Sequence, residues 1–410
     1  MQRRTLIKLI SAATLAGCGQ HLPKTKRETR KLRVVVAGAG IIGASIAYQL
    51  AKAGAKVTVI DKLGPATHAS RGTFAWINAT WAKQPQYYHS LNQEGVANWR
   101  SLQSELKLPL RWGGSLEWFD GAERQQKLVA QIAEQVAWGE PARMLSAADF
   151  AKLEPNVNFA ADSYAAYSPN DGTVDPVLAT QELLRAAQEL GAEIHYPCEL
   201  LGVSMSGDRL VSVATSKQEI TADRLVLATG AAAGSPETIA GINIPQRTTP
   251  GVIAITKPMP RLLNRIVATQ DVHMHQRNDG RFVLGESTSV WQNDAHAVRL
   301  QGRPNIFPIP ELAQQHGSRM LAKAAKVLPS LADAVTEDAF IGWRPLPVDG
   351  HPVLGASLAK PDIYMAIMHS GVSLAPIVGQ LVAHELIQQT SVPKLDNFRP
   401  TRSFETVKRY

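Results

Sequence analysis

The 410-residue sequence predicts an α/β fold joined to a second part of α+β character that is built on a mostly antiparallel sheet. Two stretches, one starting at residue 33 and the other at residue 363, read as an apolar strand, a small-residue turn and a helix. Between them, strand-like runs at 251–256, 272–275 and 281–284 follow one another with little helix. The first pattern is typical of parallel strands covered by helices, and the second of an antiparallel sheet.

The stretch that starts at residue 33 carries three glycines at GxGxxG spacing. An apolar strand, Val34 to Ala37, leads into Gly38, Gly40 and Gly43. The first glycine permits a tight turn, the second lets backbone N–H groups approach a pyrophosphate, and the third lets helix and strand pack closely. The positive end of the following helix favours phosphate. The segment predicts a Rossmann-like dinucleotide site, and the alternative is a turn with a structural role only.

The end of this unit supplies an acidic residue. The helix ends at Gly54, and a second strand, Val57 to Ile60, is followed by Asp61. An acid at this position is placed to accept a hydrogen bond from a ribose hydroxyl. The residues themselves leave open whether the nucleotide is NAD or FAD.

The basic excess of the chain lies at its beginning. The formal net charge is +8, and the first 33 residues hold nine Lys or Arg against a single acid, Glu28. The rest of the chain is therefore electrically balanced. Nothing in it indicates binding to nucleic acid.

The basic N-terminal segment has the pattern of an export signal. Arg3 and Arg4 precede a short apolar run, and the sequence Leu-Ala-Gly follows directly before Cys18. These features resemble a twin-arginine signal and a bacterial lipobox, so 1–17 is predicted to be a signal peptide and Cys18 to be lipidated. Residues 18–32 would then be a basic tether to a membrane, on the periplasmic or cell-surface side. The alternative is an uncleaved basic tail on a cytoplasmic protein.

The chain contains two cysteines, Cys18 and Cys198. With Cys18 acylated, no internal disulfide is possible. Cys198 is expected to be an inert buried thiol, because no activating partner can be named for it. The sequence has no Ser-His-Asp, HExxH or CxxC signature, and no metal site is predicted.

The remaining elements follow from periodicity and caps. Asp175 is a suitable N-cap and Pro176 suits a first helical position. After that helix come a strand and a three-stranded meander, which turns at 206–208 and ends in an apolar strand at 225–228. The loop 64–81 is rich in small and hydroxyl residues and suits wrapping a ligand. Helices are expected at 87–108, 122–138, 146–153, 176–190 and 311–327.

Five segments occur in the order seen in one flavoprotein family: the glycine turn, GTVDP, the ATG that ends a strand, WRPLPVDGHPVLG and HSGVSLAP. On these segments the chain resembles the D-amino-acid oxidase superfamily, in the branch of glycine oxidase, sarcosine oxidase and D-amino-acid dehydrogenases. The likeness covers residues 33–390. It implies FAD rather than NAD as the cofactor.

The resemblance also implies a discontinuous domain organisation. A Rossmann-like FAD-binding domain would be assembled from three segments, and a substrate domain from the two segments between them. The FAD-binding domain is expected at 33–90, 168–235 and 340–390, the substrate domain at 91–167 and 236–339, and a C-terminal tail at 391–410.

A set of FAD-contacting residues follows from matching this sequence to the family pattern. The family more often has Glu at the position of Asp61, and usually glycine at the positions of Met368 and Ser373, so the local contacts are expected to differ there. The implied set is Gly38, Gly40, Ile41, Ile42 and Gly43 for the pyrophosphate, Asp61 and Lys62 for the ribose, Ser70, Arg71, Gly72 and Thr73 for the diphosphate and flavin, Val203 for the adenine, and Gly371, Val372, Ser373 and Leu374 beneath the isoalloxazine.

The turn at Gly371 also has a physical argument of its own. A helix N-terminus offers unpaired N–H groups and partial positive charge. Reduced flavin carries negative charge around N1 and C2=O, so such a helix would stabilise the reduced state. The alternative is a strand, turn and helix that bind no ligand.

Two residues are candidates for contact with substrate. Arg344 matches the arginine that holds the substrate carboxylate in the family, and a planar guanidinium can clamp a carboxylate through two hydrogen bonds. The alternative for Arg344 is a structural ion pair. His369 is expected to contact substrate or the flavin edge, or else to be structural. His273 and His275 share one face of a strand and are expected to be exposed, and the alternative is that one of them lines the pocket.

The implied reaction is hydride transfer from a carbon bearing an amine to flavin N5, which gives an imine that water hydrolyses. The substrate would be a D-amino acid, glycine or a sarcosine-like amine, and the electron acceptor oxygen or a membrane quinone. Positions that hold FAD covalently in some relatives fall near Gly342 and Ala75, with His68 offset, so non-covalent FAD is expected. The rivals are an NAD-dependent dehydrogenase and a flavin-binding scaffold or assembly factor without turnover.

Overall fold

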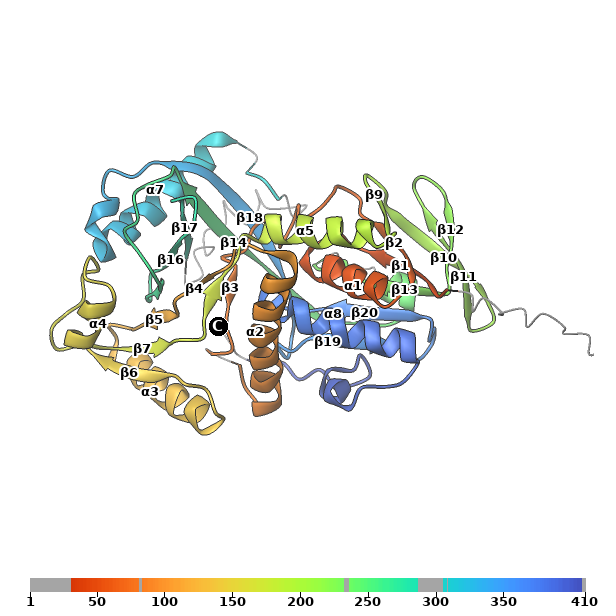
Figure 1. The fold of residues 1–410 in the computed structure, drawn as a ribbon, viewed down its shortest axis with the longest axis horizontal. Helices are drawn as coiled ribbons and strands as arrows, with labels where there is room; N and C mark the ends of the chain where they lie inside the picture. Colours follow the sequence, from red (N-terminus) through yellow and green to blue (C-terminus); the bar gives the residue numbers. More distant parts are fainter. Residues whose placement is uncertain (1–30, 81–82, 232–235, 287–304, 308, 408–410) are drawn as a thin grey trace, which may run out of the picture. The chain divides into compact units, whose positions relative to one another are not determined.

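The structure is a computed structural model that describes residues 31–80, 83–231, 236–286, 305–307 and 309–407 (Figure 1). The predicted signal peptide, Cys18 and nearly all of the predicted tether lie outside the described residues. No described helix combines the length and the apolar character needed to cross a bilayer.

A six-stranded sheet in the order β19-β20-β13-β1-β2-β9 forms the first half of the fold. Its strands pair in parallel, except that β19 is antiparallel to β20 at the edge. The central strands are short apolar runs, as expected of strands buried on both faces. The bounds are β1 Arg33–Ala37, β2 Lys56–Ile60, β9 Glu193–His195, β13 Arg224–Leu227, β19 Val353–Ala356 and β20 Ile363–Ile367.

Helices cover one face of this sheet and the meander covers the other. Val34 and Val36 of β1 pack in a core with α1, α5 and α8, whereas Val35 and Ala37 pack in a core with the meander. This alternation follows from the two-residue repeat of a strand. Asp175 caps α5 as predicted, since its side chain accepts hydrogen bonds from the N–H groups of residues 177 and 178. The bounds are α1 Ile41–Lys52, α5 Pro176–Glu189, α8 Gly371–Gln388, β10 Leu200–Ser206, β11 Arg209–Thr215 and β12 Glu219–Thr221.

An eight-stranded sheet, β18-β14-β17-β16-β15-β5-β7-β6, forms the second half. It is antiparallel apart from the β15–β5 pair, which confirms the mostly antiparallel sheet. The two long strands β14 and β18 lie side by side (Figure 1). Strands β6 and β7 were not predicted. The bounds are β5 Ser115–Glu117, β6 Arg143–Ser146, β7 Tyr164–Ser168, β14 Gln246–Thr256, β15 Ile266–Ala268, β16 Val272–Gln276, β17 Phe282–Glu286 and β18 Thr336–Pro347.

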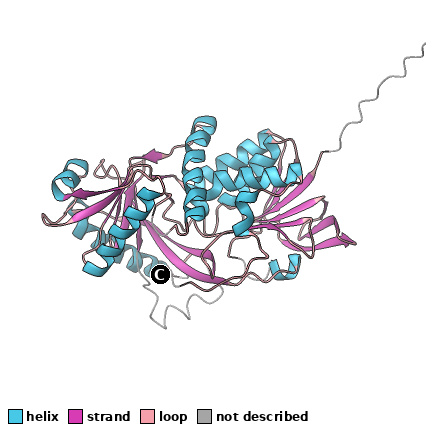
Figure 2. Ribbon diagram, turned by 90° about the horizontal axis from the view of Figure 1, so that it is seen from below, coloured by secondary structure: helices cyan, strands magenta, loops and turns pink. Residues whose placement is uncertain are grey.

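The second sheet has its own helices and a separate core. Residues of α7 pack against alternate residues of β14, β16 and β17, and Figure 2 shows helices beside the strands of each sheet. A small sheet, β3-β8-β4, completes the fold. The bounds are α3 Ala122–Ala137, α4 Ala147–Leu153, α7 Pro310–Val327, β3 Trp76–Ile77, β4 Arg111–Trp112 and β8 Gly172–Thr173.

Three predicted domain boundaries do not coincide with the limits of the hydrophobic cores and sheets. Helix α2, Gln86–Leu106, belongs wholly to the first core through residues such as Trp99, so a boundary at 90 divides one helix. Strand β18 belongs to the second sheet as far as Pro347, beyond the predicted boundary at 340. The described part of the predicted C-terminal tail, residues 391–407, is anchored to the fold, because Leu395 and Phe398 have no exposed surface and lie in the first core.

Candidate functional site

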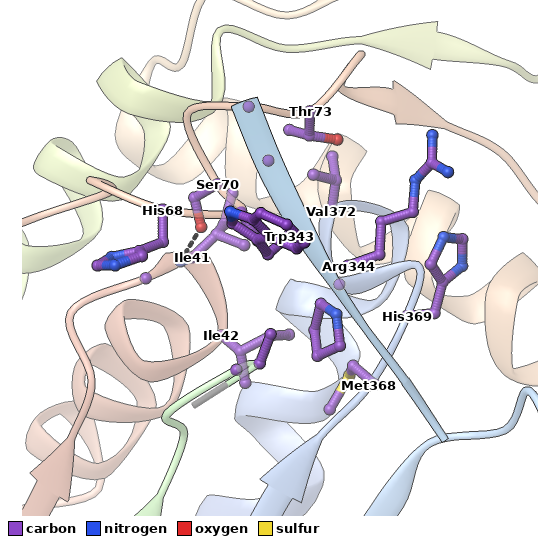
Figure 3. Close-up of a pocket in the computed structure, with 18 of the residues that line it drawn as sticks. Ile41, Ile42, His68, Ser70, Thr73, Trp343, Arg344, Met368, His369 and Val372 are labelled. Carbon is purple, nitrogen blue, oxygen red and sulfur yellow. Dashed lines mark hydrogen bonds between the residues drawn. The ribbon is translucent and has the colours of Figure 1, made fainter. Parts of the chain in front are cut away.

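A cavity of about 790 Å³ opens at the carboxyl ends of the parallel strands. This edge is where ligands bind in open parallel sheets. Its walls come from the ends of β1, β2, β13 and β20, the loop after β2, the first turn of α8, and one face of β14, β16, β17 and β18. Figure 3 shows Ile41, Ser70, Thr73, Arg344, His369 and Val372 around it. The lining therefore combines the glycine turn with residues from the far end of the chain.

The glycine turn has no room for side chains. Gly38 has a φ of +110°, and a Cβ there would stand 2.3 Å from the carbonyl oxygen of Ala228. A Cβ on Gly43 would stand 1.9 Å from the oxygen of Gly38. At Gly40, which lines the cavity, the nearest atom to an added Cβ is Ser70 Oγ at 3.2 Å. The backbone of Gly40 thus faces the cavity with no side chain of its own in between.

The side chains of Ser70 and Asp61 accept hydrogen bonds from backbone N–H groups of the glycine turn. Ser70 Oγ accepts a hydrogen bond from the N–H of Ile41 at 3.0 Å, drawn dashed in Figure 3. Asp61 lines the cavity, but its carboxylate accepts from the N–H groups of Ala39 at 2.9 Å, Leu63 at 2.8 Å and Gly64 at 2.9 Å. A carboxylate has about four acceptor sites. Asp61 therefore holds the turn, with little acceptor capacity left for a ribose.

The loop that follows β2 crosses β18 at very short range. A Cβ on Gly72 would lie 2.4 Å from the Cα of Gly342, and a Cβ on Gly342 would lie 2.2 Å from the oxygen of Gly72. The two glycines line the cavity where the strand and the loop meet. Arg71 is exposed instead, with its guanidinium 4.0 Å from the ring centroid of Phe340, and it does not line the cavity.

Helix α8 begins at the cavity wall. Ser370, just before the helix, has a left-handed backbone with φ of 60°. Ser373 is buried, and its Oγ donates to the carbonyl oxygen of Trp76 at 3.2 Å and accepts from the N–H of Asn78 at 3.1 Å. The serine that stands where the family usually has glycine therefore ties β3 to α8. Leu374 points into the first core and does not line the cavity.

Arg344 lies on β18 and lines the cavity (Figure 3). Gly251 on the neighbouring strand leaves space for it, because a Cβ there would stand 2.9 Å from Arg344 Nη2. His273 also lines the cavity, and burial together with the positive charge of Arg344 lowers its pKa to about 4. The imidazole is therefore neutral near pH 7 beside a permanent cation.

The expected exposure of His273 and His275 is wrong, and the alternative, that one of them lines the pocket, holds for His273. His275 is 3% exposed, and its Nε2 lies 3.0 Å from the carbonyl oxygen of Phe74. The loop after β2 covers this face of β16. Phe74 and Trp76 form an aromatic wall with His273, at centroid distances of 5.7 Å and 6.0 Å from its ring.

Several cavity residues were missed in the sequence analysis. Lys83 and Tyr88 line the cavity beside the start of α8, although nothing in their sequence context forms a motif. Beside Asp61, Cys198 and Leu200 line the cavity, whereas Val203 lies further along β10 and packs against the core. Gly43 also lies outside the lining. Among the described residues, no group of three or more His, Cys, Asp or Glu side chains is arranged to hold a metal.

Known proteins resemble this chain over nearly its whole length. The profile of the family described as FAD dependent oxidoreductase, DAO, matches residues 33–385. Hydrogen cyanide synthase subunit HcnC from Pseudomonas aeruginosa is 28% identical over 89% of this chain and 94% of its own. Glycine oxidase from Geobacillus kaustophilus is 24% identical over 91% and 98%. The crystal structure of L-proline dehydrogenase from P. horikoshii superposes with a TM-score of 0.78 at 24% identity, covering 90% of this chain and 97% of that one.

The family profile spans both sheets and every part of the cavity wall. The superposition shows the same fold over nine tenths of the chain. The glycine turn alone left NAD and FAD open, and the family match decides for FAD. The chain belongs to the DAO family of FAD-dependent oxidoreductases.

Proposed function

We propose that this FAD-dependent oxidoreductase oxidises the carbon–nitrogen bond of a small amino acid or a secondary amine that carries a carboxylate. The observation that carries the proposal is Arg344, which enters the FAD cavity from β18 beside a neutral His273. The similarity to proteins named glycine oxidase and L-proline dehydrogenase supports the same substrate class.

The residues of the cavity fit FAD. Its volume lies within the range of cofactor sites, about 300–1,000 Å³. The space in front of Gly40 accepts a pyrophosphate, because only a serine hydroxyl borders it. The first turn of α8 offers backbone N–H groups and partial positive charge at the other end. Bound FAD supplies the two-electron acceptor for substrate oxidation.

The wall around Arg344 orients the substrate. A guanidinium gives two parallel hydrogen bonds to a carboxylate, which fixes the neighbouring carbon. Phe74 and Trp76 form an apolar part of the same wall, against which the rest of the substrate can pack. Neutral His273 can accept a hydrogen bond from the substrate amine without adding a competing positive charge. Loss of two electrons and two protons from the amine carbon and nitrogen gives an imine, which water hydrolyses.

We infer that FAD is held without a covalent bond. Gly342 packs so closely on Gly72 that a cysteine side chain at this position would overlap the backbone. Ala75 carries no nucleophile. His68 lines the cavity but is offset from the position that holds FAD covalently in some relatives, and its Nδ1 lies 3.2 Å from Thr67 Oγ1.

Anaerobic reduction of the bound flavin tests the substrate class. The purified holoenzyme is mixed without oxygen with glycine, sarcosine, proline and a panel of D-amino acids, and the visible absorbance of the flavin is followed. At least one amine is expected to bleach it. If none does, the proposed substrate class is wrong. Readmitting oxygen or a quinone analogue then identifies the electron acceptor.

Substitution of Arg344 tests the carboxylate clamp. For the amine that bleaches the flavin, Arg344→Gln is expected to weaken apparent affinity about 100-fold, because two charge-assisted hydrogen bonds are lost. Arg185→Gln on the exposed side of α5 is the matched control and should leave the affinity unchanged. An unchanged affinity in Arg344→Gln would contradict the clamp and favour a structural arginine.

A further inference from the structure

Lys83 enters the wall of the cavity from the segment before α2. It is only 9% exposed, and it lines the cavity together with Ser370 and Gly371 at the start of α8. Lys83 Nζ donates a hydrogen bond to Ser370 Oγ at 2.6 Å. A nearly buried lysine is uncommon and costs desolvation energy, so its place here needs a physical reason.

The side chains around Lys83 hold its amine at the helix start. Tyr88 donates from its hydroxyl to the same Ser370 Oγ at 3.2 Å, and Lys83 Nζ lies 5.7 Å from the centroid of the Tyr88 ring. His369 Nδ1 lies 3.2 Å from Ser370 Oγ. Ser370 is thus a common acceptor that keeps the lysine next to the first turn of α8.

Two sources of positive charge therefore meet at one end of the cavity. The N-terminus of an 18-residue helix carries about half an elementary charge. The ammonium group of Lys83 adds one whole elementary charge. Because Lys83 is mostly shielded from water, its field inside the cavity is screened less than that of a surface lysine.

We propose that Lys83 is an electrostatic residue of the FAD site, which stabilises the reduced, negatively charged cofactor and thereby raises its reduction potential. Ser370 and Tyr88 are positioning residues that hold the lysine in place. The proposal rests on FAD as the cofactor and on the cavity, and it does not depend on which amine is the substrate.

The test compares charge-removing and charge-keeping variants of the holoenzyme. Lys83→Gln keeps a donor for Ser370 but removes the charge, and Lys83→Arg keeps the charge. The readouts are the two-electron midpoint potential and the dissociation constant for sulfite, which adds to electron-poor flavins. Lys83→Gln is expected to weaken sulfite binding about tenfold and to lower the potential correspondingly, by about 30 mV for a tenfold change. Lys83→Arg should stay close to the wild type.

Lys127→Gln is the matched control, because it removes a lysine on the exposed side of α3 that does not line the cavity. In the FAD-loaded protein it should leave the potential and sulfite affinity unchanged. A purely structural role of Lys83 would lower the melting temperature of Lys83→Gln with no change in potential, and this result would overturn the proposal. Since both readouts use dithionite or sulfite rather than an amine, failure of the proposed substrate class leaves them interpretable.

Discussion

Two buried carboxyl groups lie behind the aromatic wall of the cavity. Asp171 has no exposed surface, and its Oδ2 accepts from Trp76 Nε1 at 2.8 Å and from Ser115 Oγ at 2.7 Å. Burial raises the pKa of Asp171 to about 7. Burial also raises the pKa of Glu117 to about 8, and the charge of Asp171 adds to the rise. The Asp171 carboxyl group, which accepts the hydrogen bond of the Trp76 indole, therefore changes its charge near neutral pH.

This pair predicts a pH-dependent loss of stability. Between pH 5 and pH 8 an unfolded glutamate is ionised, while folded Glu117 keeps its proton, so the folded state binds more protons and loses stability as the pH rises. Glu117→Gln does not titrate. Its free energy of unfolding, relative to wild type, is expected to increase by about 2–4 kcal/mol from pH 5 to pH 8. Urea unfolding at both pH values measures it.

Glu189→Gln is the control for that experiment, because Glu189 is exposed at the end of α5. Its stability difference from wild type should stay nearly constant over the same range. A constant difference in Glu117→Gln as well would show that Glu117 is ionised in the folded protein.

At the same scale, the sequence singled out Arg344 as a candidate and left open whether His273 lines the cavity. Arg344 stands in a long motif whose residues keep fixed spacing. The alternation of His273 and His275 showed only that they share a face. Which face is covered depends on Phe74, about 200 residues away in the sequence, and no local pattern contains that information. Asp61 was predicted after β2 as an acceptor for a ribose hydroxyl, whereas the three backbone N–H groups from which it accepts depend on the folded turn.

Among the elements, the contact between the loop after β2 and strand β18 joins the two halves of the cavity. Gly72 and Gly342 meet with their backbones in contact, so neither position can carry a side chain. This approach places Ser70 of the loop and Arg344 of the strand in the wall of one cavity. Glycine is required here for close approach rather than for an unusual φ.

Gly342→Ala is expected to destabilise the protein and to weaken FAD retention. Its Cβ would stand 2.2 Å from the oxygen of Gly72, so strand and loop must separate, at a cost of about 2–3 kcal/mol. Gly202→Ala on β10 is the matched control, because no atom lies within 4 Å of its added Cβ. Thermal unfolding and the ratio of flavin to protein absorbance measure both effects. Equal behaviour of the two variants would contradict a close crossing.

The elements that the sequence predicted well are those with a local cause. The glycine turn, the Asp175 cap and the period of α7 each act over a few residues. Strands β6 and β7 were missed because they are short and partly exposed, so they lack a strong apolar alternation. Helix α2 was predicted with nearly correct bounds but divided between the two predicted domains at residue 90, since its partner α8 lies near the other end of the chain.

For the molecule as a whole, the predicted export signal lies outside the described residues and has to be tested in solution. We propose that Cys18 carries a lipid and anchors the enzyme on the outer side of a bacterial membrane. Cys18→Ser is expected to abolish incorporation of labelled fatty acid and to move the protein from the membrane to the soluble fraction. Cys198→Ser should leave labelling unchanged, since Cys198 is buried. Labelling that persists in Cys18→Ser would contradict lipidation at this residue.

The order of strands in the first sheet also has a consequence for synthesis. β1, made near the beginning, pairs with β13, whose preceding residue Asp223 lies 190 residues beyond Arg33. β13 in turn pairs with β20, made near the end. On the ribosome, the glycine turn therefore emerges long before α8 and β18 can close the opposite wall. Such distant pairing is slow and leaves apolar surface uncovered meanwhile. FAD can be enclosed only after translation is nearly complete. Binding of the cofactor is therefore a late step, which accompanies the closing of the cavity by α8 and β18.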